Sequence, residues 1–419
     1  MKTIFLGTVE ISGILSQLMK GLTEREYKVI TLNKQKHKYN YFVKNYRFQT
    51  LIQFLTKVSQ GIHNKLLRKT LIALRECILF SVLPYYIFKC DTFIFLAGES
   101  ILYSNFDLPI LKFFKKNIIV EFLGSDSRPA YVNGAFENSS TKDLIKINQN
   151  LKKRISFIEK YATHIICWPP TSIFFSKNLI NGFYIGVPIE INNYVEEKKD
   201  GVKILHCPSR LKGKGTYIFR KIINELKNEG YSFEYKELHN VPNSTVKKEL
   251  KTANIVLDQI YSDVPLAVFA SEAASFKVPS IVGGYFNKDN CRYFCDLSNI
   301  PPSDYVEPEK IKETLKMYLD NPHYVKQKGE ELYNFVNTHY NYKIVTENII
   351  KIVEDKIPDS WFYSPYDVEY IYGFGLSLDE ICSRCKKIIN EYTPSALLLD
   401  DKPKLKRIII NLCDGKIND

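Results

Sequence analysis

The sequence of 419 residues contains no low-complexity tract and no short-period repeat, so it gives no sign of a repeat architecture. Its N-terminal stretch, MKTIFLGTVEISG, lacks an apolar run of signal-peptide length, and we expect the protein to stay in the cytoplasm. The most apolar stretch, 70–88, contains Arg75, Glu76 and Pro84, whereas a spanning helix needs about 20 mostly apolar residues. We therefore expect a helix that lies on a membrane surface.

Acidic residues are scarce in one segment. From Lys28 to Lys89 there are twelve Lys or Arg residues and a single acidic one, Glu76, so most of the formal net charge of +12 lies here. The segment is also rich in aromatic and aliphatic side chains, which suits an anionic membrane surface, although a solvated basic face has the same composition. Because no recognised nucleic-acid module accompanies the charge, we do not expect nucleic acid as a partner.

Cysteines are present without the signature of a disulfide framework. Their number is nine, and an odd number scattered through a long chain fits a reducing compartment. Cys382 and Cys385 form a CxxC pair, and Cys291 and Cys295 form a CxxxC pair. The four thiols have the spacing for a zinc site, and each pair also has the spacing of one helix face.

Two globular domains are expected from the length and from the 45% of hydrophobic residues. Short β-branched or aromatic runs alternate with longer helical runs, which is typical of βαβ units with parallel sheets, and the pattern occurs twice. The predicted fold class is α/β, with two Rossmann-like domains facing each other across a cleft. We assign 1–190 to the first domain, with its basic segment 28–89, then 191–201 to a linker, 202–350 to the second domain and 351–419 to an extension of unknown role.

The expected secondary structure places the loops in which chemistry can occur. The predicted strands are 3–6, 27–32, 92–96, 117–122, 164–168, 202–207, 232–238, 254–259 and 279–283. The predicted helices include 11–22, 151–161, 215–228, 243–251, 267–276, 378–392 and 404–412. Ligands of open parallel sheets bind outside the carboxyl ends of the strands, so we expect the site in the loops that follow them.

The stretch HCPSRLKGKGT, 206–216, lies between a predicted strand and a predicted helix. A P-loop requires lysine followed directly by serine or threonine, but Gly215 separates Lys214 from Thr216, which argues against that loop. Arg210 and Lys214 still place cations before a helix N-terminus, and Gly215 permits close backbone approach, which together favour a diphosphate site. Thr216 either contacts the diphosphate or caps the helix.

A carboxylate in an apolar helix is the second candidate feature. Glu272 is flanked by alanines, and burying its charge is costly unless a partner compensates it. The two hydroxyls of a ribose would do so, and backbone amides or a lysine such as Lys214 are the alternative. Asp258 and Gln259 end the preceding strand, and we group them with Asp263 as further ribose or sugar contacts.

The order of these motifs resembles the GT-B glycosyltransferases, especially those of glycosyltransferase family 4. In the second half the resemblance rests on HCPSRLKGKGT, ANIVLDQ, EAASFKVPSIV and PPSDYVEPEKIKETLKMYLDNP. In the first half it rests on IFLGTVEISGILSQLMKGL, FDLPILKFFKKNIIVEFLGSDSR and FYIGVPIE. The match covers roughly 3–350 and implies transfer of a sugar from a nucleotide-sugar donor, with retention of anomeric configuration.

The resemblance also implies roles for single residues. Arg210 and Lys214 match the basic pair at the donor diphosphate, and Glu272 matches the carboxylate at the donor ribose. The remaining assignments are Gly7, Gly13 and Gly124 in the cleft loops, and Asp126 or Glu99 as the acceptor base. No Asp-x-Asp motif is present, and we expect neither a metal nor a cofactor beyond the nucleotide-sugar as co-substrate.

The sequence departs from the family pattern at positions that handle the sugar. Val264 replaces a glutamate, Leu123 replaces a histidine, Lys277 replaces a glycine, and Pro265-Leu266-Ala267 replaces a glycine-rich turn. Three hypotheses stay open: a glycosyltransferase, a sugar-nucleotide epimerase of the same architecture, and a non-catalytic basic binding protein. The basic segment favours a transferase at the inner face of the cell membrane, acting on a saccharide or lipid-linked acceptor in cell-surface polysaccharide or glycolipid synthesis.

Overall fold

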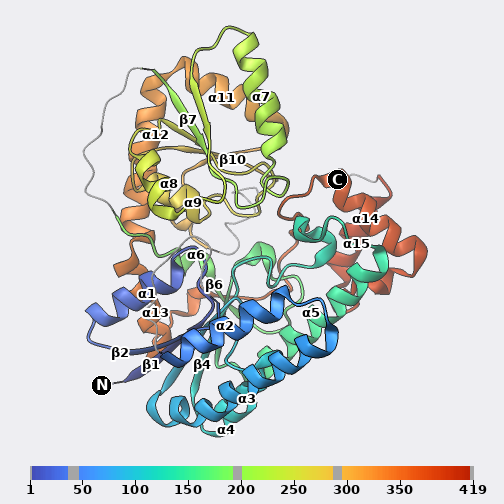
Figure 1. The fold of residues 1–419 in the computed structure, drawn as a ribbon. Coiled ribbons are helices and arrows are strands. Elements are labelled where there is room, and N and C mark those ends of the chain that lie inside the picture. Colours follow the sequence, from blue (N-terminus) through green and yellow to red (C-terminus); the bar gives the residue numbers. More distant parts are fainter. Residues whose placement is uncertain (1, 36–46, 192–200, 286–294, 416–419) are drawn as a thin grey trace.

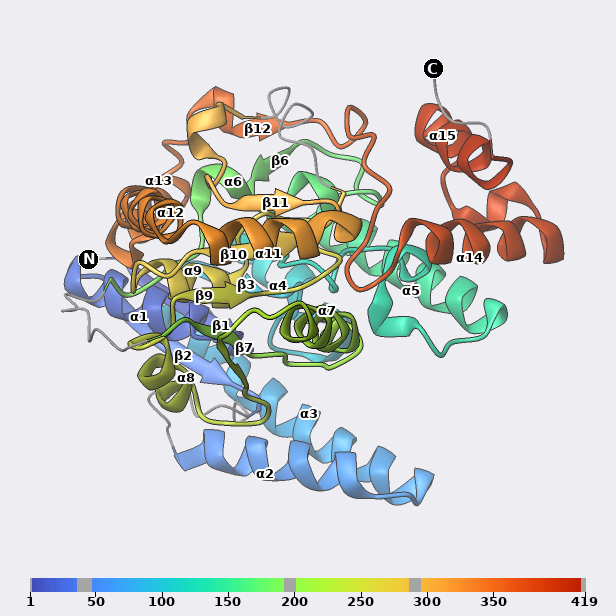
Figure 2. The same ribbon diagram turned by 90° about the horizontal axis from the view of Figure 1, so that it is seen from above.

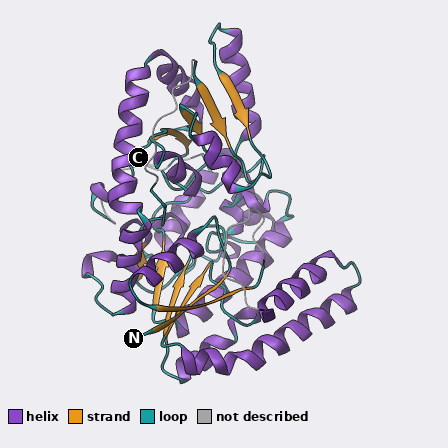
Figure 3. Cartoon of the chain, turned by 60° about the vertical axis from the view of Figure 1, so that its left-hand side comes forward, coloured by secondary structure: helices purple, strands orange, loops and turns teal. Residues whose placement is uncertain are grey.

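Two α/β domains make up the protein in a computed structural model, which describes residues 2–35, 47–191, 201–285 and 295–415 (Figure 1). Each domain has its own sheet with helices around it, and Figure 3 shows the strands of the two sheets in separate bodies. Cys291 and most of the predicted linker lie outside the described residues. The predicted fold, with two Rossmann-like domains and an extension, is confirmed.

The first sheet has seven strands in the order β12-β6-β5-β4-β3-β1-β2. Its strands are β1 (Thr3–Thr8), β2 (Lys28–Asn33), β3 (Thr92–Leu96), β4 (Asn117–Glu121), β5 (His164–Cys167), β6 (Leu179–Asn181) and β12 (Phe362–Tyr363). All pair in parallel except β12, which is antiparallel to β6. Along β4, Ile118 and Val120 enter one core cluster while Ile119 enters another, so the strand is buried on both faces.

Helices cover both faces of the first sheet. They are α1 (Ile14–Glu24), α2 (Arg47–Gly61), α3 (Lys65–Lys89), α4 (Asp107–Phe113), α5 (Thr141–Tyr161) and the short α6 (Gly182–Ile185). In α1 the buried side chains include Ile14, Leu15, Leu18 and Leu22, the spacing of one helix face. The long α5 begins where the Ser140 hydroxyl accepts a hydrogen bond from the Asp143 N–H.

The second sheet has five parallel strands in the order β11-β10-β9-β7-β8. They are β7 (Lys203–His206), β8 (Glu234–Glu237), β9 (Ile255–Leu257), β10 (Ser280–Gly283) and β11 (Asp304–Val306). Its helices are α7 (Thr216–Asn228), α8 (Asn243–Leu250), α9 (Val268–Ala274), α11 (Ile311–Asp320) and α12 (Pro322–Phe335). The strand order changes direction between β7 and β9: β8 is added on one side of β7, and β9 and the later strands are added on the other. The loops that follow β7 and β9 therefore lie next to each other at the carboxyl end of the sheet.

The chain crosses between the domains at two neighbouring points. The Ile189 N–H donates to the Tyr340 carbonyl at 2.7 Å, and the Tyr342 N–H donates to the Ile189 carbonyl at 2.9 Å. After this crossing α13 (Tyr342–Val353) packs against α1, and its Val345 and Ile349 join the core of the first domain. The range 202–350, predicted for the second domain, therefore contains most of a helix that packs on the first.

The C-terminal extension packs on the first domain as well. Its helices α14 (Leu378–Glu391) and α15 (Pro403–Cys413) lie beside α5 in Figure 1, and their Ile381 and Ile409 share a core cluster with Ile155. A capping box between Ser377 and Glu380 starts α14. The extension is thus part of the folded first domain.

Within the basic segment, α2 and α3 form an antiparallel hairpin, which projects from the first domain in Figure 2. The second half of α3 is anchored, since Leu83 and Tyr86 are buried in the core of the first domain. By length and composition α3 could cross a membrane, with a mean hydropathy of 1.7 and 22% of its most apolar window buried. The anchored half cannot enter a bilayer without exposing the core that it covers.

Candidate functional site

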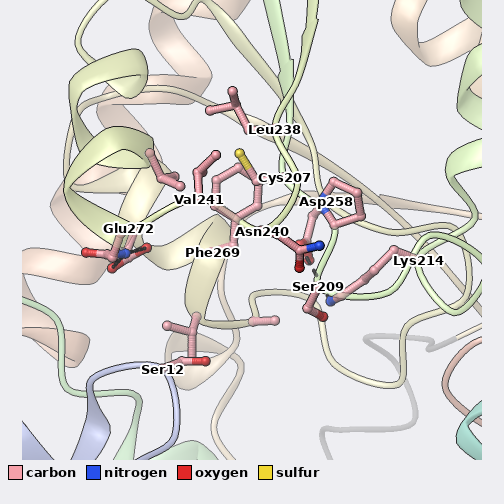
Figure 4. A pocket seen from close by; sticks show the side chains of 15 residues that line it. Ser12, Cys207, Ser209, Lys214, Leu238, Asn240, Val241, Asp258, Phe269 and Glu272 are labelled. Atoms are coloured by element: carbon pink, nitrogen blue, oxygen red, sulfur yellow. Dashed lines mark hydrogen bonds and ion pairs between the residues drawn. The ribbon is translucent and has the colours of Figure 1, made fainter. Parts of the chain in front are cut away.

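A cavity of about 220 Å³ opens at the carboxyl ends of β7 and β9 (Figure 4). Lys214 and Asp258 lie on one side of it, Glu272 of α9 lies on another, and Ser12 approaches from the loop after β1. The lining thus comes from both domains, although most of it belongs to the second. This position is where the sequence predicts the site.

Lys214 is the cation of this cavity. Its Nζ contacts the Gln259 side-chain oxygen and lies 4.0 Å from the Asp258 carboxylate. The side chains of Lys214 and Asp258 are 15% and 1% exposed, and burial lowers the pKa of Lys214 and raises the pKa of Asp258, while their mutual attraction opposes both shifts. The second carboxylate oxygen of Asp258 has no partner among the described residues, so the pair has unused polar capacity.

Glu272 supplies the carboxylate. Both of its side-chain oxygens accept hydrogen bonds from the Asn243 amide, at 2.9 and 3.1 Å. Burial raises the pKa of Glu272 to about 7, while the Asn243 hydrogen bonds and nearby Lys247 lower it. Lys214, proposed above as an alternative partner, lies on the other side of the cavity in Figure 4. The carboxylate therefore faces the cavity without a bonded cation in the described part of the chain.

Thr216, a predicted diphosphate contact, is the first residue of α7 and its hydroxyl bonds within the protein. The Thr216 hydroxyl donates to His206 Nε2 at 2.9 Å, because His206 Nδ1 lies 2.7 Å from the Leu257 carbonyl and must carry the ring proton. Burial lowers the pKa of His206 to about 4, so the ring is neutral. Thr216 is fully buried and makes no side-chain cap, which corrects both of its predicted roles.

Gly215 and Arg210 also differ from the sequence prediction. Gly215 is the N-cap of α7 with φ of 70°, and a Cβ placed on it would lie 2.2 Å from the Ile260 side chain. The N–H groups of Lys214 and Gly215 already donate to carbonyls of the same loop, so they do not form a phosphate cradle in this conformation. The Arg210 side chain is exposed and does not line the cavity.

Asp263 of the second domain forms an ion pair with a residue of the first domain. Its carboxylate forms an ion pair with Arg128, from the loop after β4 in the first domain, and the two side chains are 6% and 3% exposed. Burial lowers the pKa of Arg128 to about 10, and its Nε has no hydrogen-bond partner among the described residues. Arg128 was missed at the sequence level, where only its neighbours Gly124 and Asp126 were assigned. Its signal, an arginine two residues after an aspartate in a cleft loop, is not distinctive.

The carboxylates predicted to act on the acceptor, and Glu121 near them in sequence, differ in their exposure and hydrogen bonds. The Asp126 carboxylate accepts hydrogen bonds from the Leu123 and Gly124 N–H groups, at 3.0 and 2.7 Å, and so holds the turn after β4. Glu99 is exposed in the loop after β3. Glu121, at the end of β4, is 4% exposed, and burial raises its pKa to about 8. A buried glutamate in this strand was also missed at the sequence level.

The glycines assigned to the first domain's cleft loops serve the backbone. Gly13 is the N-cap of α1 in the left-handed region, and its N–H donates to the Glu10 carboxylate at 2.9 Å. Gly7 lies within β1, where a Cβ would lie 2.6 Å from the Leu32 carbonyl oxygen. Of this first loop, Ser12 is the residue that lines the cavity.

Among the described residues, no group of three or more His, Cys, Asp or Glu side chains is placed to hold a metal ion. Cys382 and Cys385, the CxxC pair whose spacing suits either a zinc site or one helix face, lie near Cys413, whose thiol contacts the Cys382 carbonyl at 3.6 Å. Cys295 is buried in the cluster between the two domains.

Comparisons with known proteins give a structural likeness only. A glycosyltransferase from Rickettsia africae superposes with a TM-score of 0.50 at 12% sequence identity, over 84% of this chain and 98% of that chain. The fold is GT-B. Sucrose-phosphate synthase from Thermosynechococcus elongatus superposes with a TM-score of 0.49 at 10% sequence identity, over 85% of this chain and 99% of that chain. Anabaena HepE in complex with UDP and glucose superposes with a TM-score of 0.46 at 11% sequence identity, over 85% of this chain and 100% of that chain. No protein-family model matches the chain, and no curated protein matches its sequence.

Proposed function

We propose that the protein is a glycosyltransferase that moves a sugar from a nucleotide-sugar donor to a saccharide or lipid-linked saccharide acceptor. The observation that carries the proposal is one cavity, at the carboxyl ends of β7 and β9, with a buried cation at Lys214 and, at Glu272, a carboxylate that is hydrogen-bonded to Asn243. Lys214 suits a diphosphate, and Glu272 suits two ribose hydroxyls. Both residues belong to the second domain, Lys214 to the turn before α7 and Glu272 to α9.

The reaction breaks the bond between the anomeric carbon and the diphosphate and forms a bond to an acceptor hydroxyl. The leaving diphosphate gains negative charge, and Lys214 would stabilise it more in the transition state than in the ground state. The acceptor proton passes to a carboxylate or to the leaving phosphate. Asp126 and Glu99 are the carboxylates that the sequence suggests for this step. Retention of configuration and independence of metal are parts of this proposal.

The α2–α3 hairpin supports a membrane-bound acceptor. Lys65, Arg68 and Lys69 are exposed at the start of α3, beside Leu66 and Leu67, which are 76% and 50% exposed. At the other end of α3, Phe88 is 77% exposed and packs edge-on against Phe114, with Phe113 beside it at 81%. Basic and exposed apolar side chains on one hairpin suit an anionic lipid surface. We propose that the protein is cytoplasmic, lies at the inner face of the cell membrane and works in polysaccharide or glycolipid synthesis.

Thermal unfolding in the presence of UDP, GDP, CMP and their sugars tests the donor site. A nucleotide present at 100 times its Kd stabilises the folded state by about 2.7 kcal/mol, which is readily measured. If none of these compounds raises the Tm, the donor-binding proposal is wrong. An epimerase would give the same shift, and product analysis with and without an acceptor distinguishes it, because an epimerase converts the donor sugar alone.

A further inference from the structure

A segment of the C-terminal extension, residues 368–376, runs between the two domains beside the cavity. We call it the strap. Its Phe374 carbonyl accepts a hydrogen bond from the Gly134 N–H of the first domain at 2.6 Å, and its Gly375 N–H donates to the Tyr261 carbonyl of the second domain at 3.0 Å. The strap is therefore bonded to both sides of the cleft.

The strap fits its place closely. A Cβ placed on Gly373 would lie 1.3 Å from the Val132 carbonyl oxygen, so glycine is required for the strap to lie against the first domain. Gly375 has φ of 77°, and its Cβ would lie 3.1 Å from the Gly213 carbonyl oxygen in the loop before α7. The two glycines hold Phe374 between these backbones.

The ring of Phe374 meets the two buried cations of the cleft. Lys214 Nζ lies 4.9 Å from the ring centroid, and the Arg128 guanidinium carbon lies 5.9 Å from it. Both distances are within the range of a cation–π interaction, which strengthens as the cation loses water. One aromatic side chain from the extension thus contacts the cation of each domain.

Each of the two cations that meet the ring has a carboxylate partner. Lys214 is opposed by Asp258, and Arg128 is opposed by Asp263. Two buried cations repel each other, and nearby anions or an aromatic face offset that repulsion. The Phe374 ring supplies such a face, and it limits the positions that both long side chains can take.

From these contacts we infer that the strap completes the diphosphate-binding site, with Phe374 as a positioning residue for Lys214 and Arg128. Arg128, which is ion-paired with Asp263 and does not line the cavity, holds the ring from the side of the first domain. This inference rests on the proposed function, because it needs a diphosphate ligand. It gives the extension a role in donor binding, and it assigns that role to a residue that does not itself line the cavity.

The test compares binding of UDP and uridine by calorimetry to the full-length protein and to Phe374→Ala. We expect the variant to bind UDP about tenfold more weakly, because the cations lose their common contact, and to bind uridine as the wild type does. Phe374→Tyr keeps the ring and should restore UDP binding. A variant that has lost its fold would lose both ligands, so the ratio of the two affinities separates the explanations.

A matched control comes from the same extension. The Tyr366 ring lies 5.2 Å from Lys402 Nζ, a similar contact away from the cavity, and Tyr366→Ala should leave UDP binding unchanged. The inference is overturned if Phe374→Ala binds UDP as tightly as the wild type, or more tightly, as a segment that blocks the site would predict. Absence of UDP binding to the wild-type protein would instead count against the proposed function.

Discussion

Replacing Glu272 with glutamine should stabilise the empty protein at alkaline pH and weaken nucleotide binding at the same time. Burial raises the pKa of Glu272 from 4.5 to about 7, so the folded protein binds this proton more tightly than the unfolded chain does. The resulting stability is fully present below pH 4.5 and is lost as the pH rises toward 7. Above pH 7 the ionised carboxylate lowers the free energy of unfolding by up to about 3 kcal/mol.

Nucleotide binding has the opposite dependence on pH. Ribose hydroxyls donate to the ionised carboxylate, so UDP should bind about tenfold more tightly for each pH unit up to about 7, and its affinity should then level off. Glu272→Gln removes the charge and should weaken UDP binding at pH 8 by about 2 kcal/mol, or roughly thirtyfold. Calorimetry from pH 5.5 to 8.5, with thermal unfolding of the empty protein over the same range, measures both effects.

The control is Glu330→Gln, which removes an exposed carboxylate of the same domain that pairs with Lys277. We expect Glu330→Gln to show neither the higher Tm at alkaline pH nor the weaker UDP binding that we expect for Glu272→Gln. If wild-type UDP affinity is flat between pH 5.5 and 7, and Glu272→Gln binds UDP normally at pH 8, Glu272 does not bind the ribose.

Three further predictions concern other parts of the molecule. Lys214→Ala should abolish detectable UDP binding, and Lys214→Met, which leaves Asp258 equally unpaired but fills the space, should do the same if charge is what matters. Thr216→Val should lower the free energy of unfolding by about 1–3 kcal/mol, because His206 Nε2 loses its donor, yet leave UDP affinity unchanged; a loss of affinity with intact stability would return Thr216 to the diphosphate. The wild-type protein should float with anionic liposomes. A variant in which the charges of Lys65, Arg68 and Lys69 are reversed should no longer float but should bind UDP as the wild type does; unchanged flotation would contradict the membrane proposal.

Much of the architecture could be predicted because parallel sheets buried on both faces leave a strong local pattern. Runs such as 117–122 and 164–168 are short, apolar and followed by turns, and each contains a strand of the first sheet. The division into domains was harder to predict. α13 follows the second domain in sequence, but its apolar face belongs to the first, and helix periodicity does not reveal which sheet a helix covers.

The site was predictable where the residue type alone limits the chemistry. Lys214 before α7 and Glu272 within α9 both line the cavity, as the sequence predicts. Few residue types can supply a cation or a carboxylate, so these two stand out in the sequence. The pairing of Arg128 with Asp263 spans 135 residues of sequence, and it depends on how two domains meet. The bond between Thr216 and His206 depends on the direction of side chains, which a strand-and-helix pattern does not specify.

The placement of α13 and β12 has a consequence for synthesis of the chain. Ile4 and Leu15 of the first domain share their core cluster with Ile349 and Ile352, and β6 gains its outer neighbour only at Phe362. As the chain leaves the ribosome, the second domain is therefore complete before the first can bury its apolar face. The domain that begins the sequence is the last to finish folding, and its unfilled core would be the surface that chaperones encounter.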